Sequence, residues 1–345
     1  MPIKHRAALL AAVAVLLAGC TTGSGSSLPP ATRVAEASPP STGASASPGA
    51  VESMAGVVLD GSVVYDKTAG NDVHAIYLLS AGSERQVTKP GAYQLAGISA
   101  DRLRILVIPS GDLAPPLAGG TIDLDGMNFT NLKLGDPTLN FLPATWSLDG
   151  SRIAFLGWDD ADPARTGIYT ARASDLGDLV RVTTRPGPLL DVPLDYAPDG
   201  QSIVFYRSAH PDPDPHTGGS LWTVSVNGGE PKEISGASHP ADWARWSPDG
   251  GRIVFATERL ASSGSVWTVS PDGSNLASVF TDPDGGFPIT PTWSPNGSEI
   301  LFALDPTNDE FAHVPNMFAL IRSDGTQLRR VVGTTGFNRW PEWWN

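Results

Sequence analysis

The segment His210-Pro-Asp212-Pro-Asp214-Pro-His216 places two imidazoles and two carboxylates close together in the chain, and these are side chains that bind zinc or manganese. His239 and His313 fall in other loops that we expect on the same face of the molecule. The spacing matches no fixed metal-ligand motif. A solvated loop stiffened by proline is therefore the alternative interpretation of the segment, and we predict no bound cofactor.

Recognisable catalytic motifs are absent from the sequence, which contains no Gly-x-Ser-x-Gly elbow, no His-Glu-x-x-His and no P-loop. The single cysteine cannot form a disulfide within the chain. The 36 Asp and Glu residues outnumber the 23 Lys and Arg residues, and the formal net charge is −13. This balance is the opposite of what phosphate contacts need, so we expect no nucleic-acid partner.

Acidic residues gather in the loops that we expect on one face of the molecule, together with a tryptophan that lies outside the repeat described below. An acidic surface attracts a basic partner, and tryptophan often dominates the energy of an interface. We therefore expect a protein or peptide partner, basic in character, with Trp158 as its anchor. The candidate partner-binding residues are Trp158, Asp159, Asp160, Asp162, His216, Asp284 and Asp309.

The start of the chain predicts export and lipidation. Basic residues precede an apolar run at 7–17, too short to cross a membrane, and Leu17-Ala-Gly-Cys20 follows. This tetrapeptide resembles the lipobox of bacterial lipoproteins, which implies cleavage before Cys20 and a lipid on its sulfur. We therefore expect a signal peptide at 1–19. Residues 20–55 should be the lipidated cysteine and a disordered tether, because 28 of residues 21–55 are Ser, Thr, Pro, Gly or Ala.

A repeat of 47 to 50 residues fills the rest of the chain. Its clearest copies begin with an aromatic residue and run through a Ser-Pro-Asp-Gly turn into a strand that ends in Phe, as in residues 246–255. Asp in such turns can bond its own backbone and Gly can take positive φ, so we interpret the turns as structural and not as calcium sites. The opening positions of the copies are Ile98, Trp146, Tyr196, Trp246, Trp293 and Trp343.

Each repeat reads as four short strands, and self-similarity at this period is typical of propeller blades. The sequence therefore predicts an all-β fold, a six-bladed propeller of four-stranded antiparallel blades over residues 56–345. The first repeat lacks its opening strand, and the chain ends at 339–345 with an opening strand that has no blade after it. We expect these two parts to pair and close the ring.

The aromatic-Ser-Pro-Asp-Gly units, followed by Ile-x-Phe, resemble the repeats of TolB-like β-propellers in bacterial envelope proteins. The resemblance covers residues 56–345 and implies the propeller fold in the cell envelope. The separate N-terminal domain of TolB is not matched, and the copy at 94–140 is weak. The role of TolB in its own complex therefore does not carry over.

The sequence favours a non-enzymatic protein- or peptide-binding lipoprotein that is extracytoplasmic and held at a bacterial membrane through its lipid anchor. We expect the partner on the face with the long loops between second and third strands. The alternative is a lyase-like enzyme acting on envelope polysaccharide through a His/Asp metal site on that face, since oligogalacturonate lyases have related propellers with a histidine cluster. The fold alone does not decide between a binding protein and an enzyme.

Overall fold

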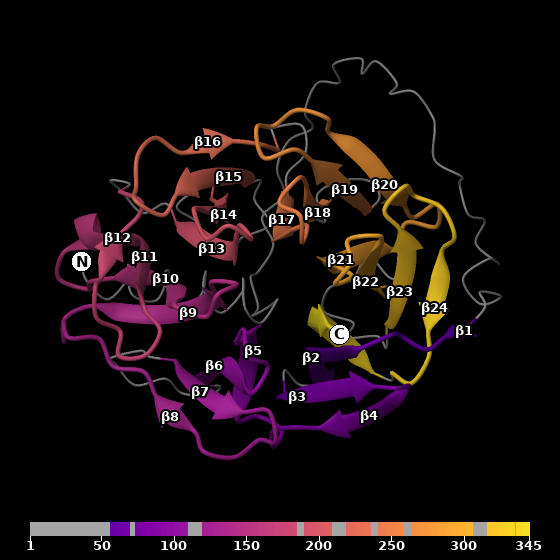
Figure 1. The fold of residues 1–345 in the computed structure, drawn as a ribbon, viewed down its shortest axis with the longest axis horizontal. Helices are drawn as coiled ribbons and strands as arrows, with labels where there is room; N and C mark the ends of the chain where they lie inside the picture. The colour runs from indigo at the N-terminus through magenta and orange to yellow at the C-terminus, as the bar shows by residue number, and fades with distance from the viewer. Residues whose placement is uncertain are drawn as a thin grey trace, which may run out of the picture.

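The computed structural model describes residues 56–69, 73–109, 119–184, 190–208, 219–235, 241–257, 264–305, 316–334 and 336–345. In these ranges, six sheets stand around one axis as the blades of a propeller (Figure 1). The only helix among the described residues is the short 3-10 helix η1 (Pro163–Arg165). The predicted all-β, six-bladed fold is confirmed.

Each blade contains four antiparallel strands, of which the innermost lines the axis and the others follow outward. From the axis outward, blade one contains β25 (Phe337–Trp344), β2 (Ser62–Ala69), β3 (Val73–Ser80) and β4 (Ser83–Gln86), and blade two contains β5 (Tyr93–Ile98), β6 (Arg104–Pro109), β7 (Gly120–Asp123) and β8 (Thr130–Asn131). In the same order, blade three contains β9 (Asn140–Trp146), β10 (Arg152–Trp158), β11 (Gly167–Arg172) and β12 (Val180–Arg181), and blade four contains β13 (Asp191–Tyr196), β14 (Ser202–Arg207), β15 (Ser220–Ser225) and β16 (Lys232–Glu233). Blade five contains β17 (Ala241–Trp246), β18 (Ile253–Thr257), β19 (Ser265–Val269) and β20 (Ala277–Thr281), and blade six contains β21 (Phe287–Trp293), β22 (Glu299–Asp305), β23 (Met317–Arg322) and β24 (Arg329–Val331).

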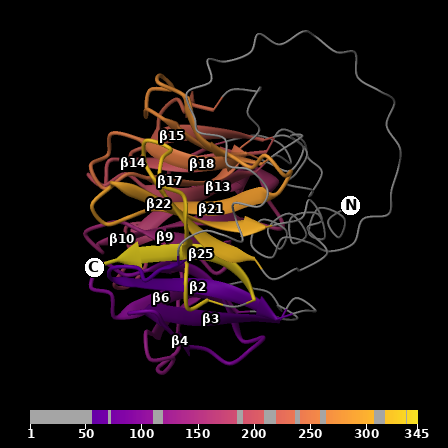
Figure 2. The ribbon, with the colours of Figure 1, turned by 90° about the vertical axis from the view of Figure 1, so that its right-hand side faces the viewer.

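The ring closes through the C-terminal strand, as the sequence predicts. Strand β25 pairs antiparallel with β2, from Ser62 opposite Trp344 to Thr68 opposite Phe337. Figure 2 shows β25 crossing the disc beside β2 to the C-terminus at one face. A second closure was not predicted. Strand β1 (Gly56–Val57) pairs parallel with β24 and adds a fifth strand to blade six.

The core consists of apolar layers between adjacent blades, because each sheet is covered on both faces. The Phe that ends the repeated motif has no exposed surface in any of its four clear copies, Phe155, Phe205, Phe255 and Phe302. Truncating one buried aromatic ring of this kind costs about 3–5 kcal/mol. The weak second copy still forms a complete blade, with Ile105 and Val107 equally buried.

The Ser-x-Asp-Gly segments are turns, as predicted. In blade three, the Ser147 hydroxyl donates to Asp149 at 2.6 Å and accepts from the Arg152 N–H at 2.9 Å. Asp149 also accepts the Ser151 N–H at 3.0 Å, and Gly150 has φ +71°. The same bonds recur in the turns of blades five and six. The turn carboxylate is therefore used by its own backbone, and we call the side of the disc that carries these turns the turn face.

Candidate binding site in the axial channel

The six innermost strands β5, β9, β13, β17, β21 and β25 surround an axial channel (Figure 1). Among the described residues, no strand pairs with the channel edge of any of them. Each of them also shifts its register against the second strand of its blade near the middle. Such bulges redirect side chains, here toward the axis. The site is therefore built from the least regular part of every blade.

An apolar chamber occupies the middle of the channel and has a cavity volume of about 80 Å³. Four of the lining strands each contribute a proline, Pro143, Pro193, Pro291 and Pro341, two or three residues before the opening residue of the repeat. Proline suits this edge because it has no N–H that would remain without a partner. The other apolar residues of the lining are Leu95, Ala96, Leu142, Ala144, Leu156, Val192, Leu194, Trp243 and Trp340.

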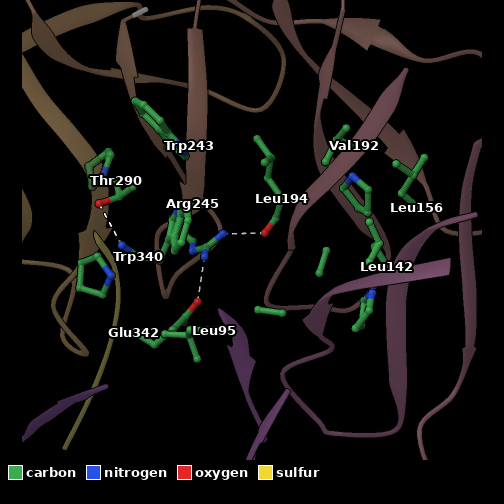
Figure 3. Close-up of a pocket in the computed structure, with 16 residues that line it drawn as sticks. Leu95, Leu142, Leu156, Val192, Leu194, Trp243, Arg245, Thr290, Trp340 and Glu342 are labelled. Atoms are coloured by element: carbon green, nitrogen blue, oxygen red, sulfur yellow. Dashed lines mark hydrogen bonds and ion pairs between the residues drawn. The ribbon is translucent and has the colours of Figure 1, made fainter. Parts of the chain in front are cut away.

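Arg245 separates this chamber from a polar space beyond it. Its Nη1 donates to the Leu194 carbonyl at 2.6 Å, and its Nη2 donates to Glu342 Oε1 at 2.8 Å (Figure 3). The three residues come from β13, β17 and β25, so the guanidinium links strands of three different blades. Arg245 and Glu342 line both spaces. The pair therefore acts as a crossbar in the channel.

The space beyond the crossbar, which we call the vestibule, has a cavity volume of about 400 Å³ and is lined in part by the turns of the turn face. Its walls include the opening residue of all six repeats, so the repeated aromatic position surrounds the channel. Two of the indoles donate to backbone carbonyls: Trp293 Nε1 to Arg245 O at 3.1 Å and Trp343 Nε1 to Asp60 O at 2.7 Å. The six opening residues are Ile98, Trp146, Tyr196, Trp246, Trp293 and Trp343.

Asp195 is the third charged residue in the depth of the vestibule. Its Oδ2 accepts the Trp246 N–H at 2.9 Å, and it forms no ion pair with any residue that the structure describes. Burial raises the pKa of Asp195 to about 7; Arg245 opposes this rise and Glu342 adds to it. Sequence reasoning missed Asp195, Arg245 and Glu342, since nothing in their local motifs distinguishes them.

Three bulky residues of the chamber region take positive φ, a conformation that costs free energy in a residue with a large or branched side chain. Trp243, Thr290 and Trp340 all have φ of 50° and lie in consecutive blades. The Trp340 N–H donates to Thr290 Oγ1 at 3.1 Å, which joins two of these bulges (Figure 3). The surrounding packing thus holds a strained chamber wall in place.

A buried histidine–aspartate pair supports this wall from behind. His74 Nδ1 lies 2.8 Å from Asp66 Oδ1, and both side chains are at most 2% exposed. The His74 ring stacks on Trp340 at 6.5 Å between centroids. Thr68 Oγ1 contacts the same ring nitrogen at 3.3 Å, so the three residues do not form a relay from hydroxyl to carboxylate. The sequence did not single out this pair.

The predicted anchor Trp158 is buried instead of projecting from the surface. Only 3% of its surface is exposed, because it ends β10 and packs with Ile108, Leu142 and Leu156. The loop that follows β10 is long, and Trp158 serves as the core residue beneath it. Trp158 therefore does not carry a partner-binding proposal.

The predicted acidic loop after Trp158 is partly neutralised within the protein. Arg165 forms ion pairs with Asp136 and with Asp159, the latter at 2.6 Å. Asp159 is buried, whereas Asp160 and Asp162 are exposed. Asp136 precedes β9 and Asp159 follows β10, so both connections open on one face, opposite the turn face, as expected. We call this side the loop face.

The side chain of Asp284 is exposed, and partial loss of hydration together with the charge of the neighbouring Asp282 raises its pKa. Its backbone N–H donates to Asp282 Oδ1 at 2.9 Å.

The predicted metal ligands lie outside the described residues, and so do the predicted partner-binding residues His216 and Asp309. No group of three or more potential metal ligands occurs in the described part of the chain. The residues outside it are His210, Asp212, Asp214, His216, His239, Asp309, His313 and Cys20.

Comparisons with known proteins give one partial relative. No protein-family model matches the chain. Over 111 residues it is 30% identical to an uncharacterized peptidase, YuxL, of Bacillus subtilis (strain 168). This stretch is 32% of the chain but only 16% of that protein, so the chain spans a small part of the relative that it matches.

Solved structures resemble the whole disc. TolB from Acinetobacter baumannii superposes with a TM-score of 0.60 at 17% identity, over 82% of this chain and 66% of that one, slightly less than two thirds of its length. A putative TolB from Agrobacterium tumefaciens gives 0.58 at 18% identity, over 81% and 90%. An oligogalacturonate lyase from Vibrio parahaemolyticus gives 0.52 at 13% identity, over 75% and 71%. At these identities the likeness is one of fold, and the chain has the TolB-like six-bladed propeller fold that its repeats predict.

Proposed function

We propose that this protein is a binding module of the cell envelope that takes a segment of a protein or peptide into its axial channel. The observation that carries the proposal is the channel itself, an apolar chamber behind a wider vestibule lined by aromatic residues. Small apolar pockets reached through a polar entrance suit anchoring side chains of a partner. No chemistry on the ligand is required.

The strained wall of the chamber supports the same proposal. Bulky residues at positive φ persist only where the surrounding structure holds them, and they cluster at ligand-binding and catalytic sites. Here Trp243 and Trp340 line the chamber, and Thr290 joins two bulges. Two indoles thereby face the place where a partner side chain would sit.

We further propose that Cys20 carries the lipid that holds the propeller at the outer side of a bacterial membrane. The support is the lipobox-like segment 17–20 and the tether-like composition of 21–55. No helix in the described residues is long and apolar enough to span a membrane. A lipid on a flexible tether would leave both faces of the disc accessible to a partner.

A metal-dependent enzyme acting on envelope polysaccharide is the competing proposal. It requires ligands such as His210 and His216 on the loop face, and a likeness of fold does not transfer the activity of a lyase. Manganese binding separates the two proposals. Titration calorimetry with MnCl₂ should show no binding for the channel-binding module and one site for the enzyme.

A blocked channel tests the binding proposal. Ala144 lines the chamber, so Ala144→Phe should fill it while an outward-facing control, Val180→Phe on β12, should not. Dodecapeptides selected from a random display library on the native protein should bind the control and lose at least about tenfold in affinity on Ala144→Phe. Equal binding to both variants, with unchanged melting temperatures, would contradict a site in the channel.

A further inference from the structure

The vestibule is lined by two carboxylates, Asp195 and Glu342, and by two guanidinium groups, Arg102 and Arg245, and only Arg245 and Glu342 form an ion pair with each other. Arg245 is already bound to Glu342 at 2.8 Å and to the Leu194 carbonyl at 2.6 Å. Asp195 accepts the Trp246 N–H at 2.9 Å and the backbone N–H of Tyr196, and it forms no ion pair within the described ranges. The unpaired carboxylate therefore belongs to Asp195.

The surroundings of Asp195 favour a cation as the missing group. The vestibule is large enough, at about 400 Å³, to admit a long side chain. Its walls include six aromatic residues and three prolines of the turns, among them Trp246, Trp293 and Pro248. Aromatic faces attract cations, and a carboxylate removed from bulk water attracts a cation more strongly than one in water.

We propose that Asp195 binds the ammonium or guanidinium group of a lysine or arginine side chain of the partner, which enters the vestibule from the turn face. This inference rests on the proposed function of the channel and specifies its ligand. The rim is suited to the flanking residues of such a segment. Leu148 is 53% exposed and lines the vestibule beside Ala100, so apolar neighbours of the cation have a surface to contact.

The other titratable groups of the vestibule are Arg102, Tyr196, Arg245 and Glu342. Arg102 lies in the turn of blade two and donates to the Ser99 carbonyl at 3.4 Å. It opposes an approaching cation, so Arg102→Gln should strengthen the binding of a basic peptide. Arg245 keeps its charge across the neutral pH range, and its contact with Glu342 leaves Asp195 as the carboxylate without an ion pair among the described residues.

A proton competes with the ligand for Asp195. Since burial raises the pKa of this carboxyl to about 7, it is mostly protonated at pH 6 and mostly ionised at pH 8. A cation binds the ionised form, whose share is about one tenth at pH 6 and about nine tenths at pH 8. The apparent affinity should therefore increase about tenfold between these two pH values.

The test uses a random dodecapeptide display library on the full-length protein and on Asp195→Asn, which keeps the size of the side chain and removes its charge. We expect the native protein at pH 8 to select peptides with Lys or Arg next to apolar residues. These peptides should bind Asp195→Asn about tenfold or more weakly, because a charge-assisted hydrogen bond is lost. Their affinity for Asp195→Asn should not change between pH 6 and pH 8.

Three results would overturn the inference, and the third would overturn the proposed function of the channel as well. Peptides that bind the native protein, lose affinity on Ala144→Phe and show no Lys or Arg preference leave the channel function intact but exclude the cation site. Equal affinity of basic peptides for Asp195→Asn and for the native protein would also exclude the cation site and leave the channel function intact. A selection that yields no peptide at all contradicts the proposed function and the inference together.

Discussion

Replacing Trp343 tests whether the C-terminal strand closes the propeller energetically as well as geometrically. The ring packs against the apolar layer between blades one and six, and its Nε1 donates to Asp60 O at 2.7 Å. Truncation of a fully buried aromatic costs about 3–5 kcal/mol, and Trp343 is only partly buried, so about 2–3 kcal/mol applies. The lost hydrogen bond adds about 0.5–1 kcal/mol. We expect Trp343→Ala to lower the free energy of unfolding by about 3 kcal/mol.

Calorimetry of the two proteins measures this effect. An unfolding entropy of about 2.1 cal/mol/K per residue over residues 56–345 gives about 0.6 kcal/mol/K, so the melting temperature should fall by about 5 °C. Val58→Ala is the matched control, because Val58 lies beside the same junction but is 53% exposed, and it should shift melting by less than about 1 °C. If Trp343→Ala melts as the control does, the strand is not needed to hold the ring closed.

The channel and the anchor give three more predictions. Arg245→Met leaves Glu342 without its cation and should cost about 2–4 kcal/mol in urea unfolding, whereas the double variant Arg245→Met, Glu342→Met should recover most of that loss; an equally unstable double variant contradicts the crossbar. Because burial raises the pKa of Asp195 from 3.8 to about 7, the folded protein holds this proton more tightly than the unfolded chain, and stability falls as pH rises across that window. The stability of Asp195→Asn relative to the native protein should therefore increase from pH 4 to pH 7, and a constant difference in unfolding free energy would refute the assignment. Cys20→Ser should leave the membrane fraction or stay as an uncleaved precursor, and a cleaved variant that still sediments with salt-washed membranes places the anchor elsewhere.

The blades could be predicted because their information is local. An aromatic residue, a Ser-Pro-Asp-Gly turn and an Ile-x-Phe strand lie within ten residues, and four near-identical copies reveal the period. The closure by β25 followed from counting strands. The pairing of β1 with β24 did not, because Gly56 and Val57 are too short a strand to carry an alternating pattern.

The candidate site could not be predicted because it depends on residues brought together only by the ring. Arg245 and Glu342 are 97 positions apart in the chain, and neither occurs in a motif that indicates an ion pair. The bulges at Trp243, Thr290 and Trp340 could not be predicted either, because none of these residue types indicates positive φ. The burial of Trp158 could not be predicted either, because a position outside the repeat register does not indicate whether a side chain is buried.

The most direct test of partner binding through the vestibule is site-specific photo-crosslinking in the cells that make the protein. A crosslinking residue at Leu148 on the vestibule rim should trap a partner protein, and one at Val180 on the outer strand β12 should not. A third position, Asp160, reports on the loop face. We predict an adduct from Leu148 that disappears in the Ala144→Phe background. Adducts from Asp160 or Val180 with none from Leu148 would contradict binding through the vestibule.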